Sequence, residues 1–248
     1  NTVDLTQVVQ LPPKEFDSFK SLMLPESRLA SQQAGGTWSN LFDYDWIQNK
    51  YPFVGVLVWY AFIFVLGLAA YPLIRLALPG LRQYAYALGR VGGLVLRAWL
   101  AWMGGSIGVP YTRLSIGVAL ALIAVTGVAL WMKRKQEFKD DWDSNRRFFV
   151  AVEIVFLSFF IIDLLIRLGN ADMWHPSKGG ERPMDFSYFN AVLKSTSFPP
   201  YDPWYAGGYI NYYYYGFVLA GTPVKLLGIV PSIAYNFILP TWFAMVAL

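Results

Sequence analysis

The stretch PFVGVLVWYAFIFVLGLAAYPLIRLAL, residues 52–78, decides the fold class of this chain. It holds one charged side chain, Arg75, and Pro79-Gly80 follows it directly. A helix needs about 20 mostly apolar residues to cross the hydrocarbon core of a bilayer. The stretch is therefore long enough to form a membrane-spanning helix, and the Pro-Gly pair is typical of its end.

Similar apolar runs follow along the rest of the chain. They cover residues 83–103, 114–132, 148–168 and 212–229, and a last one begins at 231. The run at 212–229 is the shortest. We therefore expect an all-α polytopic membrane protein of about six transmembrane helices, with the last helix truncated at the end of the chain.

The composition agrees with a membrane protein and excludes several kinds of site. Of the 248 residues, 56% are hydrophobic and 15% are charged, whereas a soluble domain carries about a quarter charged residues. The chain has no Cys and a single His, His175, which excludes disulfides, thiolate chemistry and a His-cluster metal site. We expect no resident metal or cofactor, a lipid bilayer as partner, and no nucleic acid, because the cations gather at helix ends.

The positions of Lys and Arg predict the orientation in the membrane. The segment between the third and fourth runs is the most basic; it contains Lys133, Arg134, Lys135, Lys139, Arg146 and Arg147. Because basic loops stay in the cytoplasm, we expect the N-terminal segment and the loop 169–211 to lie on the outer face of the plasma membrane. Arg75, Arg82 and Lys225 then lie on the cytoplasmic side.

Three regions follow from these assignments. Residues 1–50 are polar and mixed, and we interpret them as the outer-face tail of a preceding domain. Residues 51–147 hold three helices and the basic loop. Residues 148–248 hold a further helix, the outer loop and two more helices, so that the chain reads as a piece of a longer protein.

Four ionisable residues lie within the predicted helices, where an unpaired charge is costly. Arg90 and Glu153 are expected at one depth, and Arg97 and Asp163 at another, which predicts two interhelical ion pairs. Asp163 could instead pair with Arg167, four residues further along the same helix. Such pairs either fix helix packing, the interpretation we favour, or mark the ion path of a transporter.

The loop 169–211 and the start of the helix after it contain the most unusual chemistry. Residues 184–194 have apolar side chains at helical intervals, which predicts an amphipathic helix lying along the outer leaflet. Glu181 and Asp185 fall at its start, either as caps favoured by the helix dipole or as site residues. Asp202 before Pro203 suits an Asx turn. Four tyrosines then follow, as interfacial anchors or as site lining: Tyr212, Tyr213, Tyr214 and Tyr215.

At this loop the sequence resembles the YYY-motif (Chlor_Arch_YYY) membrane proteins of archaea and Chloroflexi-type bacteria. The resemblance rests on GERPMD at 180–185, PPYDPW at 199–204, AGG at 206–208 and INYYY at 210–214. It extends back to about residue 52. More distantly, the order of helix, acidic loop, interfacial helix, Pro-rich stretch and helix is similar to the GT-C class of polytopic glycosyltransferases.

The GT-C likeness implies a reaction and roles for particular residues. Asp185 would be the catalytic base, with Glu181 as second choice, and the donor would be a polyprenyl-phosphate sugar on the outer face. Cations would hold the donor phosphate; the candidates are Lys178, Arg182 and Lys194. Other residues would bind substrate; these are Asp202, Trp204 and the four tyrosines at 212–215. The alternatives are a non-catalytic subunit of a larger respiratory or photosynthetic membrane complex and, more weakly, a transporter.

Overall fold

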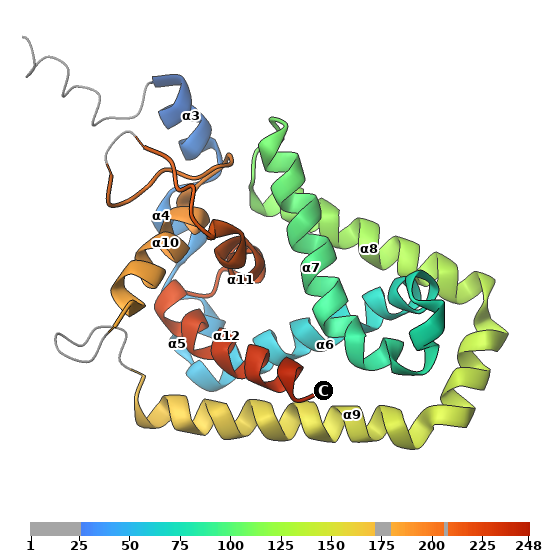
Figure 1. Ribbon diagram of the computed structural model, residues 1–248. Helices are drawn as coiled ribbons and strands as arrows, with labels where there is room; N and C mark the ends of the chain where they lie inside the picture. The colour runs from blue at the N-terminus through green and yellow to red at the C-terminus, as the bar shows by residue number, and fades with distance from the viewer. Residues whose placement is uncertain (1–25, 172–179, 206–207) are drawn as a thin grey trace, which may run out of the picture.

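The computed structural model describes residues 26–171, 180–205 and 208–248 (Figure 1). Within these ranges every regular element is helical, and one isolated antiparallel bridge joins Tyr201 to Tyr209. In chain order the elements are α3 (Glu26–Ala34), α4 (Trp38–Leu41), α5 (Ile47–Lys50), α6 (Pro52–Ala77), the 3-10 helix η2 (Pro79–Tyr84), α7 (Ala85–Ser106), α8 (Arg113–Lys133), α9 (Lys135–Gly169), α10 (Arg182–Lys194), α11 (Tyr214–Leu227) and α12 (Pro231–Val246). The predicted all-helical class is thus confirmed for the described residues.

Three of the described helices, α6, α8 and α9, are long and apolar enough to cross a membrane. Many of their apolar side chains face outward, such as Val65 and Val125, as expected for helices in contact with lipid. The sequence had predicted about six transmembrane helices. α7 has 22 residues but buries two arginines, whereas α11 and α12 have only 14 and 16 residues, fewer than the roughly 20 that a span requires.

α6 lies at the centre of the bundle and packs closely on α7. A side chain at Gly89 would meet the carbonyl oxygen of Gly67 at 2.8 Å, so only glycine allows the two backbones to approach so closely. Around this crossing the core is built of large apolar groups, including Trp59, Ile63 and Phe156. The small residues of α7 therefore fix where it crosses α6.

One end of the bundle, which we call the basic end, joins η2 and the last turn of α6 to the start of α9. The guanidinium of Arg75 is 2% exposed and binds both Glu137, at 3.0 Å, and Asp141. The hydroxyl of Tyr71 donates to the same Asp141 at 3.2 Å. Arg75 and the basic loop were predicted to lie on one side of the membrane, and these contacts bring them together.

The opposite end, which we call the loop end, gathers the segments 26–51, 107–112, 180–205 and 208–213 (Figure 1). The segment 26–51 packs onto the bundle there, because Leu41 and Phe42 lie in the main apolar core. Asn49 is buried and binds the junction of α11 and α12, donating to the carbonyl of Gly228 and accepting from the amide of Val230, both at 2.9 Å.

The prediction that residues 212–229 cross the membrane is wrong, and so is the placement of Lys225 at the basic end. Lys225 is fully buried and its ammonium donates to the carbonyls of Tyr111 and Ser195, both at the loop end. Since α11 also begins at the loop end, next to α10, both of its ends lie on the same side. Its apolar residues pack against protein rather than lipid, and α12 then runs back along α9.

Candidate functional site

The first turn of α10 places two carboxylates side by side at the loop end. α10 starts with Arg182 and Pro183, and proline suits this position because its missing N–H would have no helical partner. The amide of Asp185 donates to the carbonyl of Glu181 at 2.9 Å, so one helical turn joins them. Glu181 makes no side-chain cap hydrogen bond. The capping role considered for Glu181 is therefore not realised.

Asp185 hydrogen-bonds the hydroxyl of Tyr213, the residue that precedes α11. Partial burial raises the pKa of the Asp185 carboxyl, and the negative charge of Glu181 raises it further, while the Tyr213 hydrogen bond opposes both effects. The pKa of the Tyr213 hydroxyl is raised in turn, by loss of solvent and by the charge of Asp185. The two groups thus form a coupled acid–base pair.

Arginine and tyrosine side chains from α9 and α12 complete the surroundings of Asp185. Tyr235 of α12 packs edge-on against Phe186 and Phe189 of α10, with ring centroids 5.9 and 6.1 Å apart. Its hydroxyl lies within electrostatic reach of Asp185 and also of two cations, Arg167 and Arg182. Carboxylate and guanidinium groups of α9 and α10 therefore gather near the Tyr235 hydroxyl of α12.

Arg167, in the last turn of α9, is the member of this cluster that sequence reasoning misplaced. Its guanidinium donates twice to the amide oxygen of Asn236, at 3.0 and 2.6 Å, and is 9% exposed. The sequence offered Asp163 as its partner, at helical spacing, only as the alternative to a pair between Asp163 and Arg97. The pairing across α9 and α12 could not be read from spacing within one helix.

The four tyrosines divide between two surroundings. Tyr214 accepts a hydrogen bond from the indole of Trp102 in α7, at 3.0 Å, and Tyr215 packs edge-on against the same indole. Tyr212 and Tyr213 stay largely exposed, and their rings lie 4.0 Å apart beside α10. Tyr214 and Tyr215 thus contact α7, whereas Tyr213 contacts Asp185 of α10.

Three further predicted substrate-binding residues lie on the loop after α10 and in the last turn of that helix; these are Asp202, Trp204 and Lys194. Asp202 forms the expected Asx turn, accepting from the amide of Trp204 at 2.8 Å, and Trp204 itself is 61% exposed. Lys194 is exposed at the far end of α10. Lys178 and His175 lie outside the described residues. Within the described part of the chain, no group of three His, Asp or Glu could hold a metal ion.

A family of membrane proteins matches the part of the chain that contains the candidate site. The family described as "Uncharacterized membrane protein (DUF2298)" matches residues 96–248. The chain belongs to this family. No curated protein and no solved structure matches the chain. The match includes α10, α11, α12 and the whole candidate site, so the carboxylate cluster lies within the part of the chain that defines membership of the DUF2298 family.

The ion pair expected between Arg90 and Glu153 is present, at the edge of the DUF2298 region. The Arg90 guanidinium lies 2.6 Å from Glu153, and the hydroxyl of Tyr86 donates to the other oxygen of that carboxylate at 2.7 Å. Arg90 also lies over the ring of Phe156. Because Glu153 is held from two sides, these contacts favour a packing role over an ion path.

The second expected pair, between Arg97 and Asp163, is not formed. Arg97 is fully buried, and none of its three guanidinium nitrogens has a partner in the described structure; its nearest charge-compensating contact is the ring of Phe62, 4.9 Å away. The reason is the course of α7, which meets α9 around Tyr86 and Arg90 and then diverges from it (Figure 1). Equal depth in the membrane was not enough to bring the two side chains together.

Proposed function

We propose that this membrane protein transfers a sugar from a polyprenyl-phosphate donor to a hydroxyl group of an acceptor, at the loop end and on the outer face of the plasma membrane. The observation that carries the proposal is Asp185, a carboxyl with a raised pKa that is hydrogen-bonded to Tyr213 beside Glu181. A general base works best when its pKa approaches the operating pH, and this site moves an aspartate in that direction.

The reaction uses Asp185 to take the proton of the acceptor hydroxyl. The acceptor oxygen then attacks the anomeric carbon of the donor sugar, and the bond from that carbon to the phosphate oxygen breaks. The phosphate leaves with the bonding electrons as polyprenyl phosphate, and Asp185 later releases its proton to water. Glu181 raises the basicity of Asp185 through its charge and is the second choice as base.

Cations near Asp185 would stabilise the charge that develops on the leaving phosphate. Arg182 and Arg167 are the described candidates, since both lie near Tyr235 at the edge of the site. Guanidinium groups suit this role because they present paired donors to phosphate oxygens. Lys178 remains a further candidate. The exposed rings of Tyr212 and Tyr213 would line the path of the sugar.

The loop end faces outward in this proposal because the basic end carries the cations that stay in the cytoplasm. A lipid-linked donor suits such a site. α10 has buried Phe189, Val192 and Leu193 on one side, and we place the helix at the membrane interface, where the donor's phosphate and sugar would meet Asp185.

Substitution of Asp185 by Asn tests the proposal in the full-length protein, assayed for transfer of sugar from lipid-linked donors. We expect a loss of at least about 100-fold in rate, the usual effect of removing a general base. Asp45→Asn is the matched control, because Asp45 is exposed on the segment 26–51. Unchanged transfer in Asp185→Asn would remove Asp185 from the mechanism, and a wild type without transfer would favour the non-catalytic subunit.

A further inference from the structure

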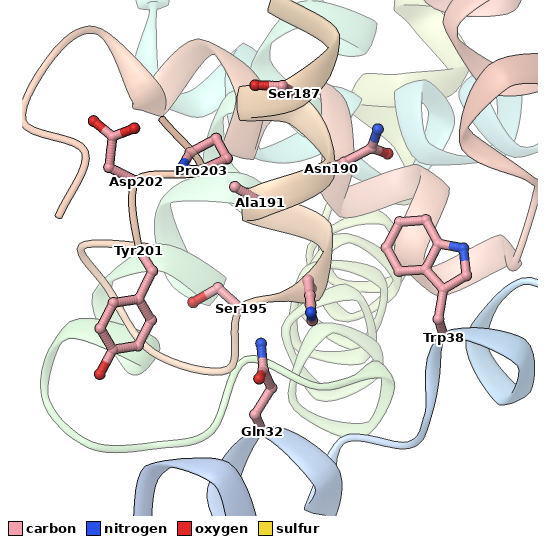
Figure 2. Close-up of a pocket in the computed structure, with 10 residues that line it drawn as sticks. Gln32, Trp38, Ser187, Asn190, Ala191, Ser195, Tyr201, Asp202 and Pro203 are labelled. Carbon is pink, nitrogen blue, oxygen red and sulfur yellow. The ribbon is translucent and has the colours of Figure 1, made fainter. Parts of the chain in front are cut away.

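A second hollow lies on the face of α10 that is turned away from Asp185. It has a volume of about 430 Å³, within the range of small-ligand sites. The residues that α10 contributes are spaced three and four apart and so share one helix face: Ser187, Asn190, Ala191 and Lys194. Figure 2 shows that Gln32 and Trp38 come from the N-terminal segment and face this helix, with Tyr201, Asp202 and Pro203 on another side.

Two polar atoms at the wall of this hollow are buried without a partner. The hydroxyl oxygen of Ser187 and the amide oxygen of Asn190 form no hydrogen bond in the described structure. Buried polar groups are nearly always paired, with protein, water or a ligand. Both oxygens have almost no exposed surface, so a ligand in the hollow would reach them only if their side chains turned toward it. Both residues line the same hollow on one face of α10, and pairing with a ligand there would remove the cost of leaving the oxygens unpaired.

The other groups of the lining narrow the chemistry of that ligand. Asp202 uses one carboxylate oxygen for the amide of Trp204 and keeps further acceptor capacity. Asp202 is the one anion and Lys194 the one cation of the lining, so its formal net charge is zero. Trp38 is 39% exposed and packs on Phe42, with ring centroids 4.7 Å apart, which fixes an aromatic face at the edge.

We propose that this hollow binds a neutral saccharide of one or two rings. Sugar hydroxyls would donate to the oxygens of Ser187, Asn190 and Asp202, and a sugar ring would pack on Trp38. A phosphate would meet only one cation, already balanced by Asp202. A lipid chain would leave the two buried oxygens unpaired. The inference goes beyond the proposed transfer, because binding here requires no reaction and does not involve Asp185.

Saturation-transfer NMR tests the proposal with maltose, cellobiose and mannobiose as probes. The full-length protein is held in lauryldimethylamine oxide micelles, since this detergent has no sugar headgroup to compete. We expect at least one disaccharide to bind, and Asn190→Leu and Trp38→Ala each to weaken binding at least tenfold. Ser232→Ala, on the exposed start of α12, is the control and should bind as the wild type does.

A milder variant keeps the test decisive if Asn190→Leu does not fold. Ser187→Ala removes an oxygen that has no partner, so the fold should tolerate it, and saccharide binding should still weaken. Absence of binding by all three disaccharides to the wild type would overturn the proposal, as would binding that these variants leave unchanged. Saccharide binding by a wild-type protein that shows no sugar transfer would support this site and refute the proposed function, whereas loss of transfer in Asp185→Asn with binding retained would agree with both.

Discussion

Glu153 and Asp185 each bind a tyrosine hydroxyl, but the next charged group is a cation beside Glu153 and an anion beside Asp185. Each accepts a hydrogen bond from a tyrosine hydroxyl, Tyr86 for Glu153 and Tyr213 for Asp185. Glu153 also binds the guanidinium of Arg90 at 2.6 Å, whereas Asp185 lies beside a second carboxylate, Glu181. A neighbouring cation favours the ionised carboxylate, and a neighbouring anion favours the protonated form.

The different neighbours of Glu153 and Asp185 suit the two carboxylates to different roles. A carboxylate held by a guanidinium and a tyrosine hydroxyl joins α7 to α9. A carboxyl whose proton affinity is raised, at the open end of the bundle, can exchange protons with an incoming hydroxyl. Stability should therefore depend on the first region and catalysis on the second.

The largest effect on stability is expected from Arg90→Leu. Removing one partner of a largely buried pair leaves the other charge uncompensated, which costs about 3–5 kcal/mol of unfolding free energy. Thermal unfolding in detergent measures it. The double variant Arg90→Leu with Glu153→Leu should recover much of the loss and keep full transfer activity. A folded double variant without activity would assign these residues to function after all.

A smaller effect of opposite sign is expected from Arg97→Met, on the same face of α7. Arg97 is fully buried and its guanidinium nitrogens have no partner among the described residues, so a flexible apolar side chain of similar length should be tolerated. We expect a gain on the order of 1 kcal/mol, since replacing buried charge by apolar groups is often stabilising. If Arg97→Met unfolds more readily than the wild type, Arg97 has an anionic partner that its contacts here do not include.

Apolar periodicity and charge predicted much of the fold. The helices that they predicted wrongly are those buried in protein rather than in lipid. Residues 52–78 and 114–132 gave helices close to their expected bounds, because length and hydropathy suffice to identify a lipid-facing span. The helix expected at 148–168 begins earlier, at Lys135, so residues 135–147, predicted as part of a basic loop, form its first turns. Residues 212–229 were misread because a short helix buried in protein is as apolar as one in lipid. The contacts of Lys225 with Tyr111 and Ser195 distinguish the two cases, and they join residues that are 114 and 30 positions apart in the sequence.

The candidate site was predictable only in its local parts. Glu181 and Asp185 belong to one helical turn, and the Asx turn at Asp202 follows from its neighbour Pro203, so sequence spacing was informative there. Arg167 and Tyr235 come from α9 and α12, and their approach to Asp185 depends on how three helices meet. The hollow opposite Asp185 likewise depends on residues of the segment 26–51, whose packing no periodicity indicated.

The pH dependence of sugar transfer in two variants tests the role of Asp185 most directly. The carboxylate is the active form, so activity is lost as the pH falls through the pKa of Asp185, which lies above the ordinary 3.8. Glu181→Gln removes a charge that raises this pKa, so the acidic limb should move to lower pH. Tyr213→Phe removes a hydrogen bond that lowers it, so the limb should move to higher pH.

Tyr86→Phe is the matched control, because it removes the same kind of hydrogen bond from Glu153 and should leave the acidic limb in place. Shifts of opposite sign in Glu181→Gln and Tyr213→Phe, with none in Tyr86→Phe, are the result that the account predicts. An acidic limb that both site variants leave unmoved, or shift in the same direction, would contradict Asp185 as the base.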